Sequence, residues 1–174
     1  IDIYRISALL NAVRDLAADN PGLHFKISLR SDVYYLVRTS DESTDKIEGS
    51  VIWHAWTNHE IFALLVKRIR TFFSEPADER VLVTLKQTQL AETLTLVMDD
   101  RFSGEGKWRN TPIHRVLMSL IRKRPRDLVK LLTLAARETR ARGGSKISTA
   151  DFKAIFDEYS QGRIQDTVNE FRFE

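Results

Sequence analysis

Cysteine is absent from this chain of 174 residues, which excludes disulfide bonds, thiolate zinc sites and cysteine nucleophiles. Glycine and proline are scarce, at 7 and 4 residues, and there is no low-complexity tract or internal repeat. No apolar run approaches the roughly 18 to 20 residues of a membrane-spanning helix, and the first residues show no signal-peptide pattern. With 43% hydrophobic and 29% charged residues, the composition is that of a globular protein, which we expect to be cytoplasmic and without membrane contact.

Sequence motifs for common chemistries are also missing. A Walker A loop needs G-x-x-x-x-G-K-[ST], and neither Gly104–Lys107 nor Gly143–Lys146 has this spacing. No G-x-S-x-G, no H-E-x-x-H and no calcium-loop pattern occurs, so we expect no catalytic residue and no metal site in this chain. Four histidines lack metal-ligand spacing and are predicted to be structural: His24, His54, His59 and His114.

The charge is unevenly distributed along the sequence. Residues 101–146 carry 13 Lys and Arg residues against 3 Asp and Glu residues, a net charge of +10 in a chain whose total is +3. Such a segment is expected to face something negative, either nucleotide phosphates, a nucleic acid or acidic groups of a protein. A solvated helix face is the alternative.

The N-terminal part of the sequence predicts a helix, a turn and a strand. Apolar residues at helical spacing predict a helix over Ile3–Asp19, which Asn20-Pro21-Gly22 ends. Residues Leu23–Arg30 alternate between apolar and polar side chains, as in a strand with one buried face. Ser31-Asp32 is expected to cap a short helix over residues 33–37.

Helices are predicted over most of the remaining chain. Thr57 and Glu60 match a capping box, for a helix that ends near Phe73. A weaker helical pattern, rich in Thr and Val, covers residues 81–98. Further helices are predicted to begin at Thr111-Pro112, to run over residues 125–142, and to begin again at Ser148 and at Ser160.

Together these patterns predict a mostly α fold with a minor β part. The lone strand at Leu23–Arg30 is not stable by itself in water, so it needs neighbours that this sequence does not supply. We expect two domains, residues 1–56 and 57–174. Three tryptophans are predicted to lie in the core: Trp53, Trp56 and Trp108.

Two positions stand out as candidate anion contacts. In Arg124-Pro125-Arg126 the proline ends one helix and opens the next. The two arginines gain nothing from the positive end of the helix dipole, so we expect a specific partner, either a phosphate or a carboxylate in an interface. Arg30 directly follows the predicted strand, where open α/β sheets bind ligands, and a plain surface arginine is the alternative there.

These pieces resemble a known family. "FKISLRSDVYYLVRTSDESTDKIEG", followed by a Trp-rich stretch, a long helix and "FSGEGKWRNTPIHRVLMSLIRKRPRDLVKLLTLAA", looks like the C-terminal half of bacterial P-loop ATPases with an AAA-like core. These ATPases are related to STAND and KAP-type NTPases. The resemblance implies that residues 1–56 are the end of an α/β ATPase core and that 57–174 form a helical lid.

The resemblance also implies site residues and partners. Arg30 would lie at the tip of the sensor-1 strand, and Arg126, with Arg124, would be the lid arginine that contacts the phosphates of the bound nucleotide. The resemblance implies ATP and Mg²⁺ as the cofactors. Because Walker A is absent and Walker B is absent or truncated, no catalysis is expected from this chain alone. The expected partner is an N-terminal P-loop part, and the resemblance is compatible with a homo-oligomer and an effector protein. Nucleotide binding and hydrolysis would then switch the lid between conformations.

Two other functions remain open at the level of sequence. One is a basic helical module that binds nucleic acid, with phosphate contacts at Arg122, Lys123, Arg124, Arg126 and Lys130. The other is a structural interaction domain, in which the same arginines pair with acidic groups of a partner chain. Steep salt dependence of DNA binding would favour the first, and loss of assembly without loss of nucleotide affinity would favour the second.

Overall fold

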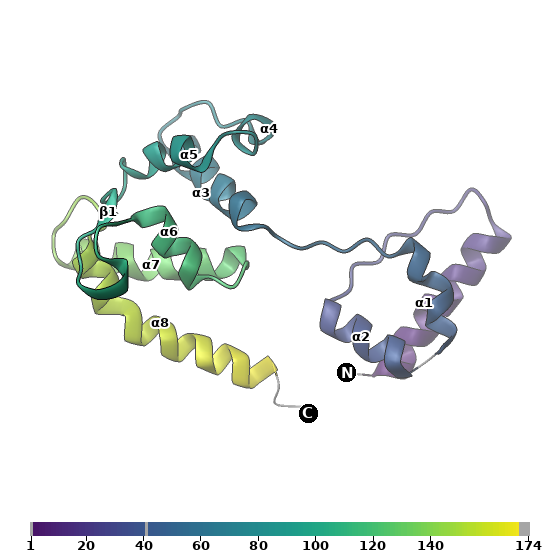
Figure 1. Cartoon of the computed structure of the whole chain (residues 1–174). Helices are drawn as coiled ribbons and strands as arrows, with labels where there is room; N and C mark the ends of the chain where they lie inside the picture. Colours follow the sequence, from purple (N-terminus) through teal and green to yellow (C-terminus); the bar gives the residue numbers. More distant parts are fainter. Residues whose placement is uncertain (1, 41, 171–174) are drawn as a thin grey trace. The chain divides into compact units, whose positions relative to one another are not determined.

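Helices make up most of this protein, whose computed structural model describes residues 2–40 and 42–170 (Figure 1). The chain divides into two units, Ile1–His54 and Ala55–Glu174. The α-helices are α1 (Ile3–Asp19), α2 (Ser31–Ser40), α3 (Asn58–Phe72), α4 (Glu79–Leu82), α5 (Gln87–Leu94), α6 (Ile113–Leu120), α7 (Pro125–Ala141) and α8 (Thr149–Glu170). Two 3₁₀ helices, η1 (Glu42–Ser50) and η2 (Gly106–Trp108), and two strands, β1 (Arg101–Phe102) and β2 (Thr111–Pro112), complete the fold.

The first unit contains α1, α2 and η1. As predicted, α1 runs over Ile3–Asp19, and the Asp2 carboxylate caps it by accepting from the Arg5 amide at 3.2 Å. Helix α2 buries three side chains, Val33, Tyr34 and Val37. This helix is longer than predicted and includes Ser31 itself.

The strand predicted over Leu23–Arg30 is wrong. These residues form no regular secondary structure, and Leu23, Phe25 and Ile27 are 49%, 44% and 41% exposed. The alternation of apolar side chains is real, but a strand also needs a neighbour to satisfy its backbone groups. Within the described part of the chain, the only sheet is the β1–β2 pair of the second unit.

The second unit begins with α3, where the predicted capping box is confirmed. Thr57 Oγ1 accepts from the Glu60 amide at 3.1 Å, and the Glu60 carboxylate accepts from the Thr57 amide at 2.7 Å. The single helix predicted over 81–98 is wrong, because α4 ends at Leu82 and α5 starts only at Gln87. Four Thr and three Val residues in that stretch weaken helix propagation, which favours the intervening turns.

A short hairpin separates these helices from the rest of the unit. Strands β1 and β2 pair antiparallel, with Arg101 opposite Pro112 and Phe102 opposite Thr111. Thr111 therefore lies in a strand rather than capping a helix, and α6 begins at Ile113 without a side-chain cap. The glycine-containing segment Gly104–Lys107 lies in the connection between the two strands of this hairpin.

Helices α7 and α8 form the C-terminal half of the second unit. Pro125 is the first residue of α7, as predicted, and Gly143, with φ of 75°, follows its C-terminus. The separate helix predicted at Ser160 is wrong, because α8 continues without a break from Thr149 to Glu170. Ser160 has neither a preceding turn nor a proline or glycine beside it that would end the first segment.

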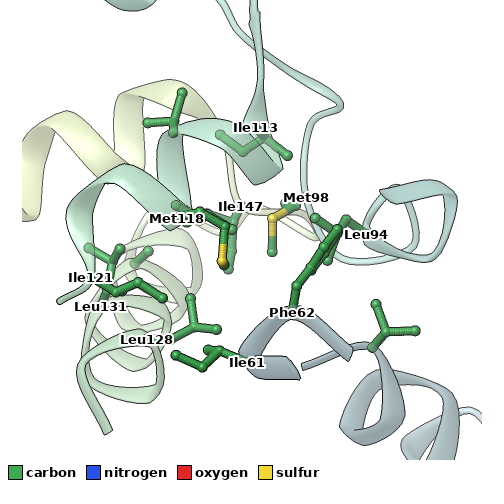
Figure 2. Close-up of a cluster of buried hydrophobic side chains, with 14 of the residues drawn as sticks. Ile61, Phe62, Leu94, Met98, Ile113, Met118, Ile121, Leu128, Leu131 and Ile147 are labelled. Atoms are coloured by element: carbon green, nitrogen blue, oxygen red, sulfur yellow. The ribbon is translucent and has the colours of Figure 1, made fainter. Parts of the chain in front are cut away.

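The core of the second unit lies between α3, α5, α6, α7 and α8 (Figure 2). Phe62, Leu117 and Leu131 are fully buried in it. Trp108 packs against this core, but the other two tryptophans do not follow the prediction, since Trp53 is 52% and Trp56 46% exposed. Among the described residues, none of the helices has the length and apolar character needed to cross a membrane.

Candidate phosphate-binding loop

Four cationic side chains gather where α6 passes into α7. Ile121 leaves α6 with an extended backbone and a buried side chain, and the next residues, Arg122, Lys123 and Arg124, are all exposed. Arg126, in the first turn of α7, is exposed as well. We refer to Arg122, Lys123, Arg124 and Arg126 as the basic loop.

The backbone of the basic loop adopts an unusual conformation. Lys123 has a φ of 51°, in the left-handed region that side chains with a Cβ seldom occupy. Arg124 is extended, as expected for a residue before proline, and occupies the N-cap position of α7 without a side-chain cap. The free amides at the start of α7 and the nearby cations give this end of the helix a positive field.

Arg126 makes no hydrogen bond or ion pair with any residue in the described ranges 2–40 and 42–170. An arginine in the first turn of a helix is opposed by the helix dipole and lies close to three other cations. An anion from outside the described residues would offset that repulsion, and phosphate and carboxylate are the anions that guanidinium binds best.

A buried ion pair holds the start of α7 in place. Asp127, the third residue of α7, is 2% exposed and forms a salt bridge with Arg163 of α8, whose side chain is 11% exposed. The Asp127 amide donates to the Arg124 carbonyl at 3.0 Å. Breaking such a pair strands a buried charge, so this contact fixes the residues directly before and after Pro125.

The same side of α8 supports the other end of the basic loop. The Tyr159 hydroxyl donates to the Leu120 carbonyl at 3.2 Å, and Arg122 donates to the Thr167 hydroxyl at 3.4 Å. Burial, and secondarily the negative charge of Asp127, raises the pKa of Tyr159, so this hydroxyl stays protonated as a donor. Tyr159, Arg163 and Thr167 recur every four residues, which places them along one side of α8. We call these three residues the α8 clamp.

Lys130, the fifth residue predicted to contact nucleic acid, lies outside the basic loop. It lies one turn further along α7, where its ammonium group forms an ion pair with Asp166 of α8 at 3.7 Å. Gly162 makes room for it, because a Cβ at that position would lie 2.5 Å from Lys130 Nζ. Lys130 therefore joins α7 to α8, whereas the four residues of the basic loop are exposed together.

Arg30 is found in the first unit and pairs with its own helix. Its guanidinium donates to both carboxylate oxygens of Asp32, at 3.1 and 2.7 Å, in the first turn of α2. This hydrogen bonding lowers the pKa of Asp32, which is otherwise exposed. Each unit is described by itself, so Arg30 is not placed in one site with the basic loop of the second unit.

No cluster of metal-ligating side chains occurs among the residues that the structure describes. His114 is buried and stacks on Phe62, with ring centroids 5.5 Å apart. Desolvation by burial, with the nearby Arg115 as a second cause, lowers its pKa. His59 contacts the Val83 carbonyl at 2.8 Å through its Nε2. Both side chains serve packing rather than ligation.

Sequence patterns drew attention to the arginines but missed the residues that position them. The charge of Asp127 suits a helix start but does not indicate that the side chain is buried, and Tyr159 and Arg163 were not singled out. One signal was available in the sequence, because Tyr159, Arg163 and Thr167 follow each other at intervals of four residues. Its meaning depends on α8 being continuous, which the predicted break at Ser160 concealed.

Comparison with known proteins identifies the helical part of the chain. A family model described as the FunZ-associated C-terminal helical domain matches residues 59–168. Neither the curated proteins nor the solved structures contain a match to this chain. The matched residues include α3, the core, the basic loop and the α8 clamp. The chain therefore belongs to the family of FunZ-associated C-terminal helical domains.

Proposed function

We propose that this domain is the helical lid of a P-loop ATPase and that its basic loop contacts the phosphates of the bound nucleotide. The observation that carries the proposal is Arg126, an exposed arginine without an anionic partner among the described residues, at the N-terminus of a buried and well-anchored helix. The resemblance of the sequence to the C-terminal half of STAND and KAP-like ATPases supports it.

The chain supplies only part of what such a reaction requires. The residues of the basic loop fit a phosphate, because they offer guanidinium and ammonium donors beside helix amides. They do not fit Mg²⁺, since no carboxylate cluster is present among the described residues. The P-loop and the metal would come from another part of the protein, as ATP hydrolysis requires both.

In this proposal, residues 1–56 are the end of the ATPase core. The exposed apolar side chains of Leu23, Phe25 and Ile27 would be covered by the rest of that core. Arg30 follows this segment, and its pairing with Asp32 would be exchanged for a phosphate.

ATP hydrolysis by the natural full-length protein tests the proposal. Replacing Arg126 with alanine should lower the turnover number by roughly a hundredfold, because an arginine on the transferred phosphate stabilises transition-state charge. Arg140→Ala is the matched control, since Arg140 is also an exposed arginine of α7 but lies at its other end. Equal activities of the two variants, or a full-length protein that does not bind ATP, would contradict the proposal.

Nucleic-acid binding is the second candidate function, and the clustering of four exposed cations within five residues favours it. It is tested by the fluorescence anisotropy of labelled single-stranded and duplex DNA over a series of salt concentrations. If phosphates of DNA are bound, Arg126→Ala should reduce the slope of log affinity against log salt by about 1, whereas Arg140→Ala should not. Absence of binding at low salt excludes this function.

A further inference from the structure

An apolar groove runs along the second unit between α3 and α7, with a volume of about 280 Å³. Its walls include Ile61 and Leu65 of α3 and Val129 and Leu132 of α7, and its floor includes Met98 and Ile147. Apart from Arg68 and Thr133, the residues that line it are apolar. Val129 remains 42% exposed, although it has valine's preference for the interior.

The α7 wall has the periodicity and length that suit a helical ligand. Pro125, Val129, Leu132 and Ala136 recur at intervals of three or four residues, which places them on one face of α7. They span about 16 Å at the rise of an α-helix, the length of three turns. Grooves of this kind between two helices bind the apolar face of an amphipathic helix.

The rim of the groove carries positive charge. Arg68, on α3, is exposed and makes no hydrogen bond or ion pair with another described residue. On α7, Arg126 lies on the same face as the lining residue Thr133, two turns or about 10 Å before it, near the groove residue Pro125 in the sequence. The ligand that complements this rim has acidic side chains flanking its apolar stripe.

We propose that the α3–α7 groove binds an amphipathic helix of a partner protein, with leucine-like side chains against Val129 and Leu132 and a carboxylate on Arg68. The proposal goes beyond the function proposed above, because it concerns a second surface whose apolar contacts do not involve the nucleotide. Arg68 supplies the specificity for acidic ligands, and the apolar walls supply most of the affinity.

A designed peptide is the probe, since the natural partner is unidentified. It is a fluorescein-labelled helix of about 18 residues with leucines at helical spacing and glutamates beside them. One matched peptide replaces the glutamates with lysines, and another replaces the leucines with serines. The full chain should bind the glutamate peptide in fluorescence anisotropy at least about tenfold more tightly than the lysine peptide, and it should not bind the serine peptide.

Variants of the full chain test whether the peptide binds in the α3–α7 groove. Val129→Asp should abolish binding of the glutamate peptide, whereas Val81→Asp, the same change at an exposed valine of α4, should leave it unchanged. Arg68→Glu should lower the affinity for the glutamate peptide and raise the affinity for the lysine peptide. Circular dichroism confirms that each variant is folded.

Three outcomes would overturn the proposal. One is equal affinity for the glutamate and lysine peptides, and a second is binding that Val129→Asp leaves intact. The third is a concentration-dependent dimer in analytical ultracentrifugation that Val129→Asp dissociates, which would assign the groove to a second copy of the chain.

Discussion

The two units of this chain differ sharply in how much apolar surface they bury. The first unit buries Val33, Tyr34 and Val37, and many of its other large apolar side chains are exposed, among them Leu9, Leu23, Phe25, Ile27, Leu36, Ile52 and Trp53. The second unit buries a continuous cluster that draws on six helices, α3 to α8.

Since burial of apolar surface is the main source of stability, the second unit has what an independent domain needs and the first does not. In the proposed function, the exposed apolar residues of the first unit would be covered by the rest of the ATPase core. The difference teaches that hydrophobic residues spread along one sequence need not be buried equally in each part of the fold.

Separating the two units should have the largest effect. A chain that starts at Ala55 should unfold in one cooperative transition at nearly the temperature of the full chain, because its core is intact. Residues 2–54 alone should show no cooperative transition. Thermal denaturation followed by circular dichroism checks both outcomes, and a cooperative melt of the short piece would contradict the comparison.

Shortening one buried side chain in each unit should show the same difference between the two units. Phe62→Ala removes a fully buried ring of the second unit and should destabilise it by about 3–5 kcal/mol. Val37→Ala removes side-chain volume at an equally buried position of the first unit, yet it should leave the main urea transition unchanged. A comparable shift for Val37→Ala would mean that the two units unfold together.

Loss of the Asp151 carboxylate should destabilise the second unit somewhat less than Phe62→Ala does. This side chain is 1% exposed and accepts from Arg142 at 2.9 and 2.8 Å, from the Ser148 amide at 2.7 Å and from the Thr139 hydroxyl at 3.0 Å. Asp151→Ala should lower the stability of the second unit by about 3 kcal/mol, because these donors lose their buried partner. Asp166→Ala, which removes a half-exposed ion pair with Lys130, should cost less than about 1 kcal/mol.

The pH dependence of stability tests the charge on Asp151. Hydrogen bonds, from the Arg142 side chain above all, hold the pKa of Asp151 well below its usual range. The stabilisation is therefore complete above the unfolded-state pKa of about 3.9 and is lost as the pH falls toward the lower folded-state value. The Asp151→Ala variant should lack this component of the acid transition.

Titration of His114 should have the smallest effect on the stability of the second unit. Its burial lowers the folded-state pKa, so protons bind preferentially to the unfolded chain below the ordinary value of about 6.5. Stability should decline as the pH falls through that region, by at most about 1.4 kcal/mol per pH unit. His114→Phe keeps a ring on Phe62 and should remove the decline. An unchanged slope in urea denaturation would show that other groups cause it.

Much of the second unit is predictable from local signals. The capping box at Thr57, the proline that starts α7 and the Asp151 carboxylate that accepts from the Ser148 amide each depend on residues within four positions of one another. Such signals act through the nearest backbone amides, and they therefore work without knowledge of the rest of the fold.

The errors arose where distant residues decide the outcome. The alternation over Leu23–Arg30 is typical of a strand, but a strand forms only when a second strand elsewhere pairs with it. The exposure of Trp53 likewise depends on whether another surface covers it. In the candidate site, the basic loop was visible as a run of cations, whereas the contact of Asp127 with Arg163 exists only once α7 and α8 lie side by side.

Helix α8 has a practical consequence for anyone who shortens this chain. Its first half packs Phe152 and Ile155 into the core, while its second half supplies Arg163 and Thr167 of the α8 clamp, which hold Asp127 and Arg122. A protein cut after Tyr159 should keep its core but lose stability, because the buried Asp127 carboxylate loses its partner, and NMR relaxation should show residues 121–126 moving freely. A shortened chain of this kind would misrepresent the conformation of the basic loop even though most of the fold remains.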